Sequence, residues 1–311
     1  APRTVSPKAV PMNTHMHLLK GATLLCVCLL VTPSLYGQGT WTRKALELAQ
    51  NNQYEEAERQ IQVAIDNGEG ADPLTWYVQA FVLKSLFVER DGRHPESTNR
   101  TAAIASAFES AQRDPEGKLN ARRAPLLSFL ADTHLEDARD GILLSQPGDA
   151  AASVVHFEAY SEINRHLNQD WDATPDAVLL DQQLAEHAFR QAELEEPQKA
   201  STWFNWGQVC YQNALSKGHD QYRSEYNLAV HTYNQGVRQF KAAENDLDAI
   251  DGALKAAAIL WQAAADGLER ALEIDADQRS GYEALAVVSE ALLKQDKIKW
   301  CKAHLVELGQ R

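Results

Sequence analysis

One spacing recurs along most of the chain: a small or apolar residue, a larger apolar residue four positions on, and another small or apolar residue three positions later. Positions four and seven apart share one face of an α-helix, so each instance predicts a helix with one apolar stripe. The instances are Ala57-x3-Ile61-x2-Ala64, Ile104-x3-Phe108-x2-Ala111, Ser153-x3-Phe157-x2-Tyr160, Ala229-x3-Tyr233-x2-Gly236, Ala264-x3-Leu268-x2-Ala271 and, less regularly, Cys301-x3-Leu305-x2-Leu308. Such repetition predicts an array of similar helical units.

A second pattern belongs to the helices that would precede these. The segment from Trp203 to Tyr211 reads Trp-Phe-Asn-Trp-Gly-Gln-Val-Cys-Tyr, and it resembles the first helix of a tetratricopeptide repeat (TPR), W-x2-L-G-x2-Y. The helix with Ala229 has the spacing of the second TPR helix and follows it. Weaker first-helix halves are Trp76 with Ala80 and Leu83, Gly141 with Leu144, Gly252 alone, and Tyr282 with Leu285 and Ala286. The chain is thus similar to the TPR family over residues 41–309.

The resemblance implies an all-α fold, a right-handed superhelical solenoid of about six antiparallel helix pairs, because one repeat cannot bury its stripe alone. Some repeats are irregular. Residues 118–145 are long enough for one extended helix that contains Pro125, and Pro175 is suited to open a helix reaching about Glu196. This last helix has no clear repeat partner in the sequence.

The N-terminal 37 residues differ from the rest, since they contain three basic residues and no acid. An apolar run, residues 21–31, follows Lys20, and Pro33 and Gly37 lie beyond it. Basic start, apolar middle and small-residue exit are the order of a secretory signal peptide. The run is too short for a comfortable membrane span. We therefore expect a signal peptide over 1–37, with translation starting at Met12, and one TPR-like solenoid over 38–311 without a transmembrane helix.

Removal of this leader would change which cysteines remain and would place the protein outside the cytosol. Cleavage near Gln38 would remove two of the four cysteines and leave Cys210 and Cys301, each in an apolar helical pattern that favours a buried free thiol. A buried N-terminal helix is the alternative interpretation of the apolar run. Leader and irregular repeats together resemble exported TPR proteins of Gram-negative bacteria, which implies a periplasmic or outer-membrane-associated protein.

The charge balance limits the partners. The chain has 30 basic and 43 acidic residues, a formal net charge of −13. A protein that coats nucleic acid needs a basic face to displace counterions, so we expect no nucleic-acid partner. The excess of acid favours protein partners with basic segments.

No constellation for catalysis or metal binding is apparent in the sequence. It lacks G-x-G-x-x-G, the Walker loop, G-x-S-x-G and H-E-x-x-H. Structural zinc needs two close Cys/His pairs, and these are absent from the helical segments. We expect no enzyme, no metal site and no cofactor.

The resemblance places binding on the concave face, which the first helices line in the TPR family. The positions transferred from the clearest matches are Tyr77, Phe81, Lys84, Phe204, Gln208, Tyr211 and Gln212. Aromatic and amide side chains suit a surface that binds a peptide or helix, although the same aromatics could instead pack the next repeat. The carboxylate clamp of chaperone-binding TPR domains is not expected, since Thr42, Leu46 and Tyr77 occupy its positions and only Asn205 matches by type.

The sequence therefore predicts a non-enzymatic protein-interaction scaffold of the cell envelope. The alternative is an envelope protein that binds a glycan or small ligand, with Trp171 or Trp203 as a stacking platform.

Overall fold

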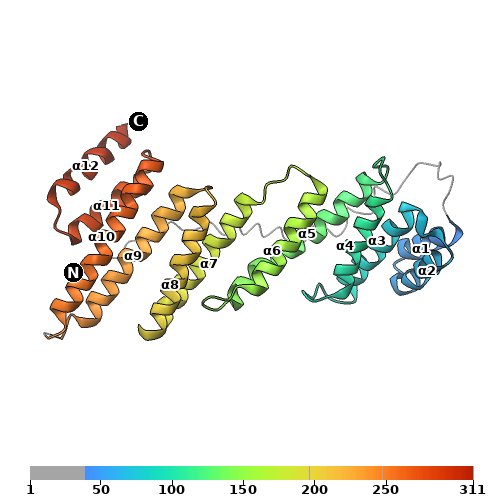
Figure 1. Cartoon of the computed structure of the whole chain (residues 1–311), viewed down its shortest axis with the longest axis horizontal. Coiled ribbons are helices and arrows are strands. Elements are labelled where there is room, and N and C mark those ends of the chain that lie inside the picture. The colour runs from blue at the N-terminus through green and yellow to red at the C-terminus, as the bar shows by residue number, and fades with distance from the viewer. Residues whose placement is uncertain (1–38, 196, 247, 311) are drawn as a thin grey trace. The chain divides into compact units, whose positions relative to one another are not determined.

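The computed structural model describes residues 39–195, 197–246 and 248–310, and helices dominate this part of the chain (Figure 1). Its twelve α-helices are α1 (Thr40–Gln50), α2 (Tyr54–Asp66), α3 (Pro73–Glu89), α4 (Thr98–Gln112), α5 (Asn120–Leu144), α6 (Ala151–Leu167), α7 (Thr174–Leu194), α8 (Pro197–Ser216), α9 (Gln221–Ala243), α10 (Ile250–Ile274), α11 (Arg279–Ala291) and α12 (Gln295–Gln310). A short 3-10 helix, η2 (Glu69–Ala71), precedes α3. Among the described residues, β-type pairing is limited to one isolated bridge, between Gln146 and Asp149. The all-α prediction is confirmed.

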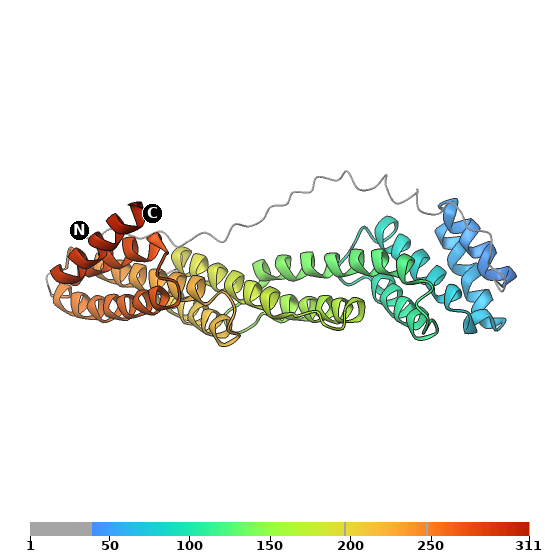
Figure 2. The ribbon, with the colours of Figure 1, turned by 90° about the horizontal axis from the view of Figure 1, so that it is seen from above.

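Consecutive helices pack as antiparallel pairs: α1 with α2, α3 with α4, α5 with α6, α7 with α8, α9 with α10, and α11 with α12. The longest pair, α9 and α10, lies side by side in both views (Figures 1 and 2). Six such pairs in the described part are consistent with a helical repeat of the size that the sequence predicts.

The pairing in the middle of the chain differs from the sequence-based prediction. The Trp203 helix is α8 and the Ala229 helix is α9, but α8 packs mainly on α7 and α9 on α10. The helix that follows Pro175 is α7, so it does have a partner. Gly252, assigned to the first helix of a repeat, lies in the same helix, α10, as the second-helix residue Ala264.

The contact between α7 and α8 explains this outcome. Gly207 of α8 lies against the ring of Phe189 in α7, with 3.0–3.1 Å between the ring atoms and the place where a β-carbon would stand. A glycine at this point lets the two helices approach closely, and this is the same glycine that gives α8 its resemblance to a first TPR helix.

The start of α3 shows how local sequence sets a boundary. Pro73 occupies the first turn, where a missing N–H costs nothing, and the Asp72 side chain accepts a hydrogen bond of 2.9 Å from the backbone N–H of Leu74. A similar cap starts α4, where the Ser97 hydroxyl accepts from the N–H of Arg100. The loop from Arg90 to Ser97 therefore runs from the C-terminal end of α3 to the capped start of α4.

The helices form two compact units, each with its own buried core. One unit, called the N-terminal unit, contains α1–α6, and its core includes Ile61, Phe87 and Leu130. The other, the C-terminal unit, contains α7–α12, and its core includes Tyr233 and Leu268.

The predicted signal peptide, residues 1–37, lies outside the described residues. Within the described residues, none of the helices combines the length and the apolar character that crossing a membrane requires.

Candidate functional site

Three of the seven predicted binding residues lie together on α3. Tyr77, Phe81 and Lys84 are each half-buried and follow one another at helical spacing. The Lys84 ammonium lies 5.3 Å from the ring centroid of Phe81 and 5.5 Å from that of Phe129, a half-buried residue of α5. Lysine over an aromatic ring is a favourable cation–π arrangement. We call Tyr77, Phe81, Lys84, Arg122 and Phe129 the α3–α5 surface.

The fold brings α3 and α5 together because they are the first helices of consecutive antiparallel pairs and so run in the same direction. Arg122 lies 45 positions after Tyr77, and Phe129 lies 45 positions after Lys84. Burial raises the pKa of Tyr77 and the charge of Arg122 acts against that rise, while Phe129 contacts Lys84. Both residue pairs therefore fit the same alignment of α3 with α5. Sequence reasoning missed Arg122 and Phe129, although this constant offset between equivalent helices would have pointed to them.

A third cation adjoins this surface from the loop after α3. The Arg93 guanidinium lies 5.1 Å from the ring centroid of Phe129, and its backbone is left-handed, with φ 61°. Non-glycine residues rarely adopt this conformation. Phe129 therefore has two cationic neighbours, Lys84 and Arg93.

These cations lack counter-ions within the described structure. The side chains of Lys84, Arg93 and Arg122 form no ion pair or hydrogen bond with any described residue. Burial lowers the pKa of Lys84, and the like charge of Arg93 lowers it further, against a smaller opposing effect of Glu89. The ammonium is thus held where its charge is poorly solvated.

Three acidic residues bear on this surface. Glu89, exposed at the end of α3, acts on Lys84 by its charge and forms no ion pair with it. Asp91 accepts hydrogen bonds from Ser97 and Asn99 and pairs with Arg90. Asp132 lies one turn beyond Phe129 on α5, and burial raises the pKa of its carboxyl while Arg139 acts against that rise. A chain with an excess of acid therefore carries a locally basic, aromatic surface here.

The other four predicted residues lie on α8, in the C-terminal unit. Phe204 and Tyr211 are 2% and 0% exposed, and both rings pack on Phe189 of α7, at centroid distances of 5.0 and 5.9 Å. Gln208 is half-buried and Gln212 is exposed. In this structure Phe204 and Tyr211 serve packing, which is the alternative that the sequence left open for them.

Tyr211 also takes part in a polar cluster between α7, α8 and α9. Glu186 accepts hydrogen bonds from the Tyr211 hydroxyl and from Asn227, and its carboxylate lies 3.3 Å from Nε2 of His231. Burial would raise the pKa of Glu186, but His231 and Tyr211 outweigh it and hold that pKa below its ordinary value. Burial and the Glu186 charge raise the pKa of Tyr211 well above its ordinary value, so it stays a donor.

A histidine pair in the N-terminal unit was also missed by sequence reasoning. Nδ1 of His134 on α5 lies 3.1 Å from Nδ1 of His156 on α6. Asp137 pairs with the buried Arg100 and lies 3.9 Å from Nδ1 of His156. The two histidines come from different helices, so no spacing within one helix could reveal them.

The described residues provide neither a metal centre nor a reactive thiol. Over the residues described, no group of three His, Cys, Asp or Glu side chains is arranged to hold a metal ion. Cys210 and Cys301 are buried free thiols, and burial raises their pKa values to about 12 and about 11. Thiolates are the reactive form of cysteine, so neither thiol suits nucleophilic catalysis.

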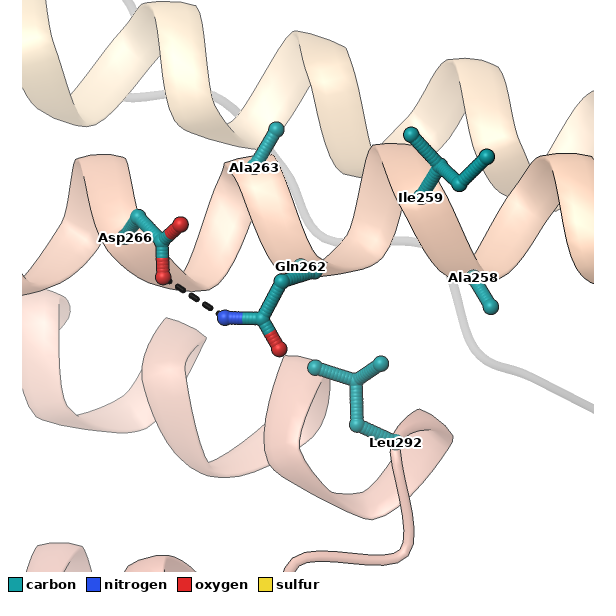
Figure 3. A pocket seen from close by; sticks show the side chains of 6 residues that line it. All are labelled: Ala258, Ile259, Gln262, Ala263, Asp266 and Leu292. Atoms are coloured by element: carbon teal, nitrogen blue, oxygen red, sulfur yellow. Dashed lines mark hydrogen bonds between the residues drawn. The ribbon is translucent and has the colours of Figure 1, made fainter.

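An open depression of about 540 Å³ lies on α10 (Figure 3). Ala258, Ile259, Gln262, Ala263 and Asp266 line it, together with Leu292 after α11. Gln262 donates to Asp266 and accepts from Lys294, so the polar side chains of the depression bond to one another, and Ile259 is 72% exposed. It is a shallow apolar face with no converging polar groups.

The two tryptophans of the alternative prediction are not exposed platforms in this structure. Trp203 is 8% exposed, and Trp171 is half-buried in an edge-to-face contact with Tyr160.

No family model matches the chain. A search of curated proteins gives no match.

Proposed function

We propose that this chain is a non-enzymatic protein-interaction scaffold and that the α3–α5 surface binds a segment of its partner. The observation that carries the proposal is the set of three unpaired cations around half-buried aromatic rings on two equivalent helices. Tyr77, Phe81 and Phe129 pack in part against the buried cores of the N-terminal unit and remain partly exposed. Aromatic and arginine side chains are enriched at protein interfaces, and Lys84 adds a charge that a partner can pair. The clusters at Glu186 and His134 satisfy their own polar groups and offer less to a partner.

A finer classification also belongs to this proposal. We infer a TPR-like right-handed superhelix from the recurring small-apolar spacing, and six antiparallel pairs support it. An experimental structure in which successive pairs rotate in one right-handed sense would bear this out, and pairs stacked without such rotation would contradict it.

Export to the periplasm or outer membrane of a Gram-negative bacterium is proposed from the leader alone. Protein purified from the envelope of a secreting host is expected to begin near Gln38. Retention of the leader on cytosolic protein would contradict export.

The scaffold function is tested by site-specific photo-crosslinking in the source cell. A photoreactive phenylalanine analogue replaces Tyr77, and in a matched control it replaces Arg59, whose side chain is 69% exposed on α2 of the same unit. We expect a discrete cross-linked partner at Tyr77 and none at Arg59. The purified partner should then bind Phe81→Ala at least about tenfold more weakly than wild type, because truncation of a central interface aromatic typically costs this much.

Equal cross-linking at both positions would show that contact is non-specific and would contradict the proposal. Circular dichroism of each variant keeps loss of binding separate from loss of fold. The expectation of basic partner segments, which rests on overall charge, applies to the remaining surface and not to this one.

A further inference from the structure

The cations of the α3–α5 surface have no anionic partner among the described residues. Lys84 and Arg93 lie about the same Phe129 ring, and burial and then the charge of Arg93 lower the pKa of Lys84. Cation–π contacts stabilise each of them only modestly. A half-buried cation without an acceptor for its N–H groups is unfavourable, so an added anion would gain more here than at an ordinary exposed lysine.

We infer that the partner segment bound here is acidic, with one carboxylate held between Lys84 and Arg93 and a second beside Arg122. The inference rests on the proposed scaffold function and adds the chemistry of the ligand. Tyr77 and Phe81 lie on the same face as Lys84, so they contact the part of the segment between its two acids.

The register of the two helices sets the spacing of those acids. Arg122 and Phe129 are seven residues apart on α5, as are Tyr77 and Lys84 on α3, which corresponds to roughly 10 Å along a helix. An extended peptide advances about 3.3 Å per residue. Two acidic residues about three positions apart, with an apolar residue between them, match this separation.

A peptide fits this surface better than a nucleic acid. Nucleic acid carries a phosphate at every nucleotide, so a chain with a formal net charge of −13 repels it beyond the three local cations. A segment with two carboxylates meets the local cations without extending far across the acidic surroundings.

The test is a selection from a random dodecapeptide library displayed on phage, with the full chain as bait. Three baits are compared: wild type, the double variant Lys84→Gln/Arg93→Gln, and the control Lys118→Gln. Lys118 lies in the same unit, its side chain is 74% exposed, and it is paired with Glu116. We expect wild type and Lys118→Gln to enrich peptides with two Asp or Glu residues about three positions apart, and the double variant not to do so.

One enriched peptide is then synthesised and its binding measured by fluorescence anisotropy. Lys84→Gln and Arg93→Gln should each weaken it about tenfold, the size of a charge-assisted hydrogen bond, while Lys118→Gln leaves it within twofold. Raising the salt concentration should weaken wild type more than the double variant.

Each contrary result has a distinct meaning. Enrichment of neutral or basic peptides that depend on Phe81 overturns the acidic ligand and keeps the scaffold function. A loss with Lys118→Gln as large as with Lys84→Gln shows dependence on net charge alone and overturns the site. No enrichment on wild type contradicts both this inference and the proposed function. Displacement of the acidic peptide by single-stranded DNA at lower concentration than by unlabelled peptide overturns the choice of a peptide.

Discussion

At the scale of single residues, burial decides what the polar groups of this chain can do. Arg100 is 1% exposed, and its guanidinium pairs with Asp137, donates to the carbonyl of Pro95 and lies over the Phe87 ring. That fixed charge lies near His134, whose pKa is lowered to about 3 by burial, then by Arg100 and His156. Arg100 and Asp137 thus pair inside the protein, and their neighbour His134 has a lowered pKa. We interpret this cluster as structural, in contrast to Lys84, which has no ion-pair partner among the described residues.

The histidine pair makes stability depend on pH. The pKa of His134 is about 3 in the folded chain against 6.5 for the free side chain, so the unfolded chain binds more protons between these values. Stability is therefore lost as pH falls below about 6.5, by about 2 kcal/mol at pH 5. His134→Leu should reduce by about this amount the difference between unfolding free energies measured in urea at pH 7.5 and pH 5.

A matched control is available for this measurement. Leu130→Ala removes a fully buried side chain of the same helix, α5, and no titratable group, so it should lower stability at both pH values without changing the difference between them. An equal acid-induced loss in wild type and His134→Leu would show that other groups control it.

At the scale of helices, the periodic sequence predicted where helices form and that they pair, but it assigned the wrong partners to α8 and α9. The predicted helix over 118–145 is α5, and that opening at Pro175 is α7. Gly207 misled the pairing because a small residue permits close approach to either neighbour, and only the three-dimensional position of Phe189 decides which. Likewise the sequence pattern predicted the three candidate residues on α3. Phe129 and Arg93 could not be predicted from it, because only the structure shows that α5 and the loop after α3 lie beside α3.

Two glycine substitutions separate helix packing from helix propensity. Gly207→Ala should destabilise the chain by about 1–3 kcal/mol, because the added methyl group meets the Phe189 ring. Gly252 is an exposed residue in the first turn of α10, and a β-carbon there would have nothing within 4 Å, so Gly252→Ala should be neutral or stabilising by about 0.5 kcal/mol. Chemical unfolding of both variants checks the contrast, and equal effects would exclude close packing as the role of Gly207.

At the scale of the whole molecule, the described chain consists of two compact units with three helix pairs each. Each unit has cores lined by small and large apolar residues, so each gains its stability mainly from its own burial. The proposed binding surface belongs to the N-terminal unit, while the buried Tyr211 cluster belongs to the C-terminal unit.

Separate cores predict separate responses to core damage. Leu130→Ala and Leu268→Ala each remove a fully buried side chain, at a cost of about 2–5 kcal/mol, one in each unit. Hydrogen–deuterium exchange should show protection lost mainly in α3–α5 for the first and in α9–α11 for the second. Uniform loss across all the described helices in both variants would show one cooperative body.

The two buried thiols have a practical consequence for such experiments. At neutral pH, a thiol with a pKa of about 11 or 12 is almost wholly protonated and reacts slowly with maleimides. A cysteine introduced at an exposed position, such as Gln212→Cys, would be labelled in preference to Cys210 and Cys301 while the chain stays folded. Dyes can therefore be attached at chosen points with both native cysteines in place. The rate at which Cys210 and Cys301 become labelled then reports how fast the chain unfolds.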